Sequence, residues 1–210
     1  MNDLLRYSRP FTCLIRHGET ELSAARCYNG LVDVGLTEKG ERQARAMAAR
    51  LRVVDWEAVL CSPLKRARRT AELAGFRDLE IVESLREFDY GDYEGKTTRQ
   101  ILSGRPDWDF WRHGCPNGET PEEAGRRLDE VIERLLIYKG AVLVFSHSHS
   151  LRILSARWVR LPAERGNMFE YFPAHLSVIS THRDYPVIAL WNDGSHLANL
   201  GTDFQMQETI

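Results

Sequence analysis

Six short apolar runs alternate along this chain with longer segments in which apolar residues recur at helical spacing. Several of the runs are apolar throughout, as strands are when both of their faces are buried. Strands that alternate with helices predict a sheet whose strands run mostly parallel. We therefore expect an α/β fold, a three-layer sandwich with a mostly parallel sheet of about six strands and helices on both faces. The expected strands are 11–15, 58–61, 79–82, 141–145, 176–180 and 187–191.

Helical spacing and capping residues predict four helices between and after these strands. Thr37 occupies the position of an amino-terminal cap for the first helix. Ser62 is expected to cap the second, with Pro63 in its first turn. Thr120 opens a capping box at the start of the third. The expected helices are 37–53, 63–74, 120–138 and about 151–159.

The length of 210 residues predicts a single domain that spans residues 1–210. A segment at about 92–119, rich in glycine, tryptophan and charged residues, is expected to form a cap over the functional site. The segment 192–210 has the composition of a loosely attached tail.

Charge and hydropathy exclude several classes of protein. With 28 Lys and Arg against 30 Asp and Glu, the net charge of −2 argues against a nucleic-acid partner. The longest apolar run is about five residues, whereas a membrane span needs roughly 20. The first ten residues do not resemble a secretory signal, and the four cysteines show no C-x-x-C spacing. We expect a cytoplasmic protein with no membrane partner.

Histidine and arginine side chains, which are common in active sites, follow three of the predicted strands. Ligands of such sheets bind beyond the carboxyl ends of the strands. Two histidines and two arginines therefore arrive independently at one edge of the sheet. The three segments are Arg16-His17-Gly18-Glu19-Thr20, Ser62-Pro63-Leu64-Lys65-Arg66 and Ser146-His147-Ser148-His149.

This combination of residue types predicts phosphoryl transfer through a histidine. A neutral imidazole nitrogen can attack phosphorus, and arginine neutralises the charge of the phosphoryl group with a planar fork that bonds two oxygens. Neighbouring cations also lower the pKa of a histidine, which keeps the nucleophile unprotonated near neutrality.

The same residues resemble the motifs of the histidine phosphatase superfamily, which includes cofactor-dependent phosphoglycerate mutases. The resemblance extends over almost the whole chain, and the motifs occur in the family's order. They are Leu14-Ile15-Arg16-His17-Gly18-Glu19-Thr20, Ser62-Pro63-Leu64-Lys65-Arg66-Ala67, Leu85-Arg86-Glu87-Phe88-Asp89-Tyr90-Gly91, Asn117-Gly118-Glu119-Thr120 and Asn192-Asp193-Gly194-Ser195-His196-Leu197.

The resemblance implies a role for each matching residue. His17 would be the nucleophile that becomes phosphohistidine, and Glu87 the general acid and then the base that activates water. The phosphoryl group would be held by Arg16, Arg66 and His147. Asn29, Gly30 and Tyr90 would line the substrate end of the site. Backbone groups of Ser148 and His149 would lie against phosphate, with Arg152 similarly placed, and Ser23 stands at a further substrate-binding position. No cofactor and no metal is implied.

Two positions depart from the family's pattern. Ser23 stands where relatives commonly have an asparagine that contacts phosphate; serine can donate the same hydrogen bond with a shorter reach. Ser148 stands where the family has glycine directly after its second histidine. A serine there would be strained if the position needs a positive φ and tolerable if it only presents its N–H.

The short connection between two motifs distinguishes a phosphatase from a mutase. The family's mutases carry a long insertion here that retains their bisphosphate intermediate, whereas Gly95 and Gly118 are only 23 positions apart. The chain most resembles the phosphatase subgroup that contains sedoheptulose 1,7-bisphosphatase and broad-specificity acid phosphatases. The implied substrate is a small phosphorylated metabolite, a sugar phosphate or bisphosphate. A second phosphate would need cations from the set Lys65, Arg69, Lys96, Arg99, Arg112 and His113.

Three alternatives stay open at this point. A cofactor-dependent phosphoglycerate mutase would use the same phosphohistidine. A metal-dependent hydrolase could use His147, His149, Glu87 and Cys61 as ligands, although an arginine-lined pocket repels a cation. A non-catalytic binder of phosphorylated ligands is possible on any fold, but such a protein is expected to lack the nucleophile or the acid, and both are present.

Overall fold

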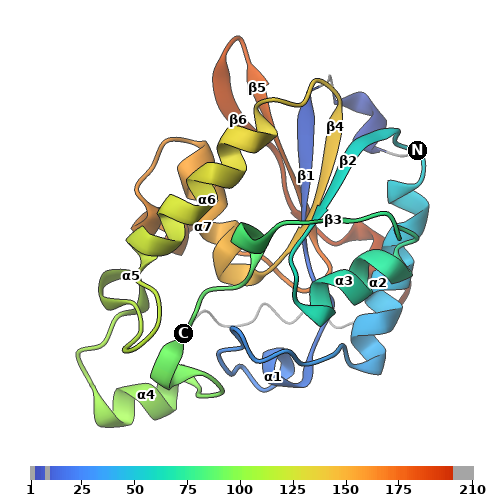
Figure 1. Cartoon of the computed structure of the whole chain (residues 1–210). Helices are drawn as coiled ribbons and strands as arrows, with labels where there is room; N and C mark the ends of the chain where they lie inside the picture. Colours follow the sequence, from blue (N-terminus) through green and yellow to red (C-terminus); the bar gives the residue numbers. More distant parts are fainter. Residues whose placement is uncertain (1–2, 8–9, 201–210) are drawn as a thin grey trace.

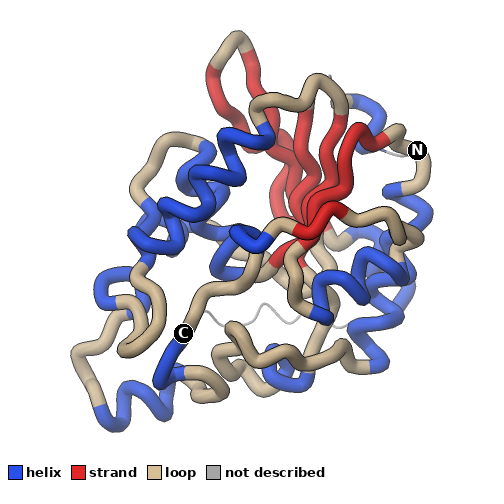
Figure 2. The backbone as a smooth tube through the Cα atoms, in the orientation of Figure 1, coloured by secondary structure: helices blue, strands red, loops and turns tan. Residues whose placement is uncertain are grey.

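A computed structural model of the chain describes residues 3–7 and 10–200. Its centre is a twisted six-stranded sheet in the order β3-β2-β4-β1-β5-β6 (Figures 1 and 2). All six predicted strands are present. They are β1 (Phe11–Arg16), β2 (Trp56–Cys61), β3 (Glu80–Ile81), β4 (Ala141–Ser146), β5 (Leu176–His182) and β6 (Tyr185–Asp193).

The sheet is mixed but mostly parallel, as predicted. Strands β1, β2, β3 and β4 run parallel, whereas β5 runs antiparallel to β1 and β6 antiparallel to β5. The reversal between β5 and β6 is a tight hairpin in which Arg183 and Asp184 both have positive φ, 48° and 68°. Two successive residues in this conformation match the right-handed twist of the strands that they join.

Helices cover both faces of the sheet and confirm the three layers. Helices α6 (Pro121–Leu135) and α7 (Ser148–Trp158) pack on one face, and α2 (Glu38–Leu51) and α3 (Lys65–Leu73) on the other (Figure 1). Neighbouring side chains of β1 enter opposite cores. Leu14 belongs to the core under α6 and α7, whereas Ile15 belongs to the core under α2 and α3.

Several of the shorter elements lie around one end of the sheet. Figure 1 places α1, α4 and α5 below the strands in that view, on the side where β1 and β4 end. Helices α4 and α5 belong to the segment 92–119. The short elements are α1 (Glu21–Ala24), α4 (Thr98–Gly104), α5 (Phe110–His113), η1 (Asp3–Arg6), η2 (Glu83–Leu85), η3 (Gly91–Tyr93), η4 (Ala163–Met168) and η5 (Ser195–Leu200).

The observed helix starts agree with the predicted ones for two helices and differ for two others. The Thr37 and Thr120 side chains cap α2 and α6 as predicted. The prediction for α3 is wrong: the helix begins at Lys65 without a side-chain cap, and the Ser62 hydroxyl lies 2.6 Å from a ring nitrogen of His147. Helix α7 begins at Ser148, three residues before the predicted start, so the strand-end histidines lead directly into its first turn.

The prediction of a loose tail is wrong for residues 192–200. Asp193 forms an ion pair with Arg50 of α2 at 2.8 Å, and Leu197 of η5 is only 2% exposed. These contacts tie the end of β6 and η5 to α2. The remainder of the predicted tail, 201–210, lies outside the described residues.

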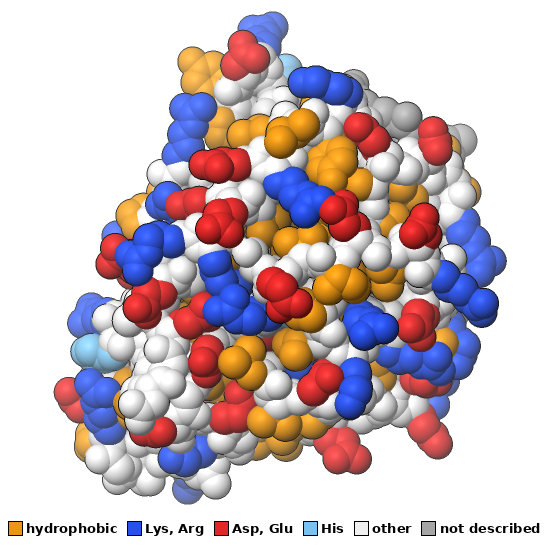
Figure 3. All heavy atoms as spheres, in the orientation of Figure 1, with side chains coloured by type: hydrophobic (Ala, Val, Ile, Leu, Met, Phe, Trp, Pro, Cys, Tyr) orange, Lys and Arg blue, Asp and Glu red, His pale blue; other side chains and the backbone are white. Residues whose placement is uncertain are grey.

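Charged side chains of both signs are interspersed over the face shown in Figure 3. This distribution agrees with the nearly neutral composition. Across residues 3–7 and 10–200, no helix has both the length and the apolar character that a membrane span requires.

Candidate active site

The three predicted strand ends meet at one edge of the sheet. Arg16 pairs with Ser146 across β1 and β4, and the N–H of His17 donates to the Ser146 carbonyl at 3.1 Å. The N–H of Ser62, directly after β2, donates to the carbonyl of Phe145 at 3.0 Å. The His17 and His147 rings consequently lie with their centroids 5.1 Å apart.

His17 is held as a neutral imidazole with one nitrogen unprotonated. The side chain is 3% exposed, and Nδ1 lies 2.7 Å from the carbonyl oxygen of Gly18. A carbonyl only accepts hydrogen bonds, so Nδ1 carries the proton and Nε2 keeps its lone pair. Burial lowers the pKa of His17 well below 6.5, and the charges of Arg66 and Arg16 lower it further. The ring is therefore a nucleophile without needing a base.

The turn after His17 packs directly on the first turn of α2. A Cβ on Gly18 would lie 2.5 Å from the carbonyl oxygen of Gly40, and a Cβ on Gly40 would collide with the carbonyl of Glu19. Two glycines in contact thus set how closely α2 approaches the nucleophile.

Arg16 presents an unsatisfied donor beside His17. One guanidinium nitrogen donates to the carbonyl of Tyr171. Within the described part of the chain, no atom accepts a hydrogen bond from the buried Nε. Burial lowers the pKa of Arg16 to about 10, so the group is still charged at neutral pH. A phosphoryl oxygen would accept a hydrogen bond from Nε, and its negative charge would balance the charge of the guanidinium.

Arg66 is hydrogen-bonded to His147 and does not line the cavity. Its guanidinium is fully buried and donates to the carbonyls of Asn29 at 2.9 Å and Gly30 at 2.7 Å. Its Nε donates to Nδ1 of His147 at 3.1 Å. Arg66 therefore places a positive charge near the nucleophile and fixes the backbone of residues 29–30 at the same time.

His147 is likewise buried behind the cavity, and its proton can be assigned. Because Nδ1 accepts from Arg66, Nε2 must carry the proton, which is directed at the Ser62 hydroxyl. Burial lowers the pKa of His147 well below 6.5, with the charge of Arg66 adding to the effect. The ring is thus neutral.

Glu87 is fixed at the amino terminus of α7. Its Oε1 accepts hydrogen bonds from the N–H groups of Phe88 and Ser150, both at 2.9 Å, and its Oε2 accepts one from the N–H of His149 at 3.2 Å. The side chain is 3% exposed but reaches the cavity. Because Oε2 has fewer donors around it than Oε1, it is the oxygen with room for a proton.

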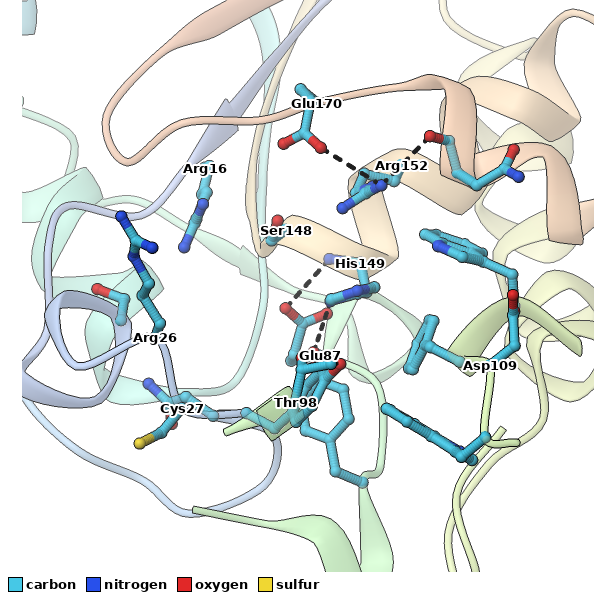
Figure 4. A pocket seen from close by; sticks show the side chains of 18 of the residues that line it. Arg16, Arg26, Cys27, Glu87, Thr98, Asp109, Ser148, His149, Arg152 and Glu170 are labelled. Carbon is cyan, nitrogen blue, oxygen red and sulfur yellow. Dashed lines mark hydrogen bonds and ion pairs between the residues drawn. The ribbon is translucent and has the colours of Figure 1, made fainter. Parts of the chain in front are cut away.

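A cavity of about 530 Å³ joins these groups, a volume in the range of small-molecule sites. In Figure 4, Arg16 and Arg26 lie on one side of it, and His149, Arg152 and Asp109 on the other. Of the sequence-predicted residues, nine line it: Arg16, His17, Ser23, Asn29, Glu87, Tyr90, Ser148, His149 and Arg152. Gly30, Arg66 and His147 do not line it.

Both departures from the family pattern find a place in the structure. Ser148 is the first residue of α7 and is not among the residues with positive φ, so serine is accommodated without backbone strain. Ser23 lines the cavity, but its hydroxyl accepts from the N–H of Thr20 at 2.9 Å and donates to the Thr20 carbonyl at 3.0 Å. Its hydrogen-bonding capacity is largely used in the capping box of α1.

The prediction of a second cation cluster at the cavity is wrong, because none of the six residues expected there lines it. Lys65 and Arg69 are paired elsewhere, with Asp33 at 3.7 Å and Glu41 at 2.8 Å. Sequence reasoning missed Arg26 and Glu170, which do line the cavity. The positive φ of Arg26, 57°, is a backbone property that no sequence motif marks.

The residues considered as metal ligands do not gather. His147 contacts Arg66 and Ser62, whereas Nδ1 of His149 lies 2.7 Å from the Tyr90 hydroxyl. Among the residues that the structure describes, no group of three or more His, Cys, Asp or Glu side chains is arranged to hold an ion.

The α/β sandwich and the cavity at its strand ends define the class of protein, an enzyme that hydrolyses phosphate esters. The chain belongs to the histidine phosphatase superfamily (branch 1), whose family model matches residues 12–194. The resemblance inferred from the sequence is thereby confirmed, and with it a phosphorylated small-molecule substrate.

Individual relatives differ in substrate. An acid phosphatase of Mycobacterium tuberculosis is 38% identical over 169 residues, covering 79% of this chain and 83% of the relative. Sedoheptulose 1,7-bisphosphatase of Saccharomyces cerevisiae is 34% identical over 190 residues, covering 74% and 70%. The solved structure of an alpha-ribazole phosphatase from Shigella flexneri superimposes with a TM-score of 0.78 at 31% identity, covering 88% of this chain and 96% of that one.

Proposed function

We propose that this phosphomonoesterase hydrolyses small phosphorylated metabolites, sugar phosphates among them, through a phosphohistidine at His17. The observation that carries the proposal is the tautomer of His17. Its Nδ1 proton is held by the Gly18 carbonyl, so Nε2 is unprotonated in a site with a buried arginine and a carboxyl group.

In the first half-reaction, Nε2 of His17 attacks phosphorus and the P–O bond to the alcohol breaks. Arg16 binds the phosphoryl oxygens through the nitrogen that otherwise has no acceptor. Arg66 supports the phosphoryl group through its positive charge near His17, and His147 does so indirectly, through its hydrogen bond with Arg66. Protonated Glu87 donates its proton to the departing alkoxide, so the alcohol leaves neutral.

In the second half-reaction, water attacks the phosphohistidine. Glu87, now ionised, accepts a proton from this water, and the bond between phosphorus and Nε2 breaks. Inorganic phosphate leaves, and both His17 and Glu87 return to their starting states. We propose that the segment 92–119 caps the cavity during this cycle. The six cations expected to bind a second phosphate lie outside the cavity, so they give no support to a bisphosphate substrate.

The proposal is tested by trapping the intermediate. Wild-type protein and the Glu87→Gln variant are mixed with a phosphate ester, quenched in alkali, in which phosphohistidine survives, and digested for mass spectrometry. The peptide that contains His17 is expected to carry one phosphoryl group, more abundantly in Glu87→Gln. His17→Ala is expected to carry none and to lose turnover. The exposed His182 supplies the control, since His182→Ala should behave as wild type. Phosphate on another residue, or turnover by His17→Ala, would refute the proposal.

A further inference from the structure

One side of the cavity is a wall of aromatic rings. Three of them belong to the segment 92–119, and the others come from three separate parts of the chain. The Phe110 and His149 ring centroids are 4.3 Å apart, and the Phe110 and Trp111 centroids 4.9 Å. The aromatic wall consists of Tyr28, Tyr90, Trp108, Phe110, Trp111 and His149.

Three polar groups of this wall are already paired with other groups of the protein. The Trp108 indole N–H donates to the Gly114 carbonyl at 2.8 Å. The Tyr28 hydroxyl lies 3.0 Å from the Thr98 hydroxyl, and the Tyr90 hydroxyl bonds His149. The three side chains therefore offer the cavity mainly the faces and edges of their rings.

The wall begins beside the proposed general acid. The backbone N–H of His149 binds Glu87, and the His149 ring contacts Phe110 and Trp111. A phosphate ester whose bridging oxygen lies at Glu87 would thus direct the rest of its alcohol along the rings. In this orientation the wall would contact the leaving group and not the phosphoryl group.

The charges on this side oppose a second phosphate. Asp109 and Glu170 line the cavity, and both are carboxylates. Among the described residues that line this side of the cavity, Arg152 is the only cation. It already donates to the Gly166 carbonyl at 3.1 Å and pairs with Glu170 at 3.5 Å. Its guanidinium also lies 4.8 Å from the centre of the Trp111 ring. Arg26 lies on the opposite side, with Arg16 (Figure 4).

We propose that the substrate is a monophosphate ester whose alcohol carries an uncharged planar ring, and that this ring stacks on the aromatic wall. This inference rests on the proposed hydrolysis at His17 and specifies its substrate class. A sugar monophosphate belongs to this class when it bears such a ring.

The test compares four esters of primary alcohols, so that the acidity of the leaving alcohol is nearly constant. They are ethyl phosphate, 2-(1-naphthyl)ethyl phosphate, 2-cyclohexylethyl phosphate and propane-1,3-diyl bisphosphate. Each ring contact is expected to change kcat/KM by about twofold to tenfold. We therefore expect kcat/KM for the naphthyl ester at least about tenfold above that for ethyl phosphate, and clearly above that for the cyclohexyl ester. The bisphosphate should be no better than ethyl phosphate.

Substitutions locate the effect. Trp111→Leu should remove most of the preference for the naphthyl ester, measured as the ratio of its kcat/KM to that of ethyl phosphate. Tyr28→Leu removes a different ring of the wall and should also reduce the preference for the naphthyl ester. Tyr185→Leu is the matched control, because Tyr185 is 69% exposed and does not line the cavity.

The outcomes separate this inference from the function on which it rests. If all four esters are cleaved with similar kcat/KM while His17 becomes phosphorylated, the hydrolysis stands and the substrate class is wrong. A preference for the bisphosphate, or equal rates for the cyclohexyl and naphthyl esters, also overturns the class. If no ester is cleaved and His17 stays unmodified, the proposed function fails and the inference fails with it.

Discussion

The segment that carries Glu87 is held by a buried ionic network, which gives a strong prediction for Glu119. The Glu119 carboxylate accepts from Arg127 at 2.7 and 3.0 Å, from Arg86 at 2.9 Å and from the N–H of Asp89 at 3.0 Å. Arg127 also donates to the carbonyl of Ser84 at 2.8 Å. Burial alone would raise the pKa of Glu119, but the bonds and charge of Arg127 lower it below its usual value.

Glu119→Gln removes the negative charge and turns an NH₂ group toward donors. The side chains of Glu119 and Arg127 are only 11% and 9% exposed, so the guanidinium is left buried and poorly paired. Breaking such a pair costs about 3–5 kcal/mol, and the lower end applies because Arg127 keeps its carbonyl partners. We expect a loss of about 3 kcal/mol, or roughly 6–12 °C in Tm for a chain of this size. We also expect kcat to fall about tenfold, because Glu87 loses its positioning.

Urea denaturation monitored by circular dichroism measures the loss. Glu122→Gln is the matched control, because Glu122 lies on α6 with Arg127 and forms an exposed ion pair. Glu122 pairs with Arg126 at 2.8 Å, and the two side chains are 76% and 62% exposed. This control should change the free energy of unfolding by less than about 0.5 kcal/mol. Adding Arg127→Met to Glu119→Gln should restore part of the stability, because no buried charge then remains unpaired. A loss below about 1 kcal/mol in Glu119→Gln would show that the network does not hold this segment.

Three further predictions follow from the site. His17→Ala should reduce kcat by at least ~10⁴-fold with a nearly unchanged Tm, and steady-state kinetics with thermal melting checks both. Burial keeps the pKa of His17, His147 and His149 well below 6.5 in the folded chain, whereas the unfolded chain takes up their protons near pH 6.5. The contribution of these histidines to the free energy of unfolding should therefore be constant above about pH 7 and fall by about 1.4 kcal/mol per histidine at pH 5.5, measured by urea titration at about pH 7 and pH 5.5; His149→Gln should remove one such increment. Gly40→Ala should lower both Tm and kcat/KM, because its Cβ would collide with the carbonyl of Glu19 and shift the turn after the nucleophile; activity equal to wild type would contradict this.

The predictable part of the site follows from local sequence and parallel-sheet geometry. β1 and β4 are recognisable as apolar runs, and parallel neighbours must end at the same edge. That rule places His17 and His147 at the same edge, and the observed pairing of β1 with β4 makes them neighbours. The assignment of Thr120 as a cap succeeded for a similar reason, because a capping box is complete within four residues.

The failures involve partners distant in sequence. Arg69 was a candidate for the substrate, but it pairs with Glu41, 28 positions away. Asp193 was placed in a tail, but it pairs with Arg50, 143 positions away. Ser62 was assigned as a helix cap, although its hydroxyl contacts His147, 85 positions away. Composition and periodicity carry no information on such pairs, because each depends on how the whole chain packs.

The division of the cavity between two parts of the chain has a consequence for engineering. Residues 98–111 supply six of the cavity side chains, including Trp108, Phe110 and Trp111, whereas Arg16, His17 and Glu87 come from other segments. A chimera that exchanges only residues 98–111 would keep the attacking and proton-donating groups and change the surface offered to the alcohol. We therefore expect that the selectivity of this scaffold can be varied within residues 98–111 while Arg16, His17 and Glu87 are kept.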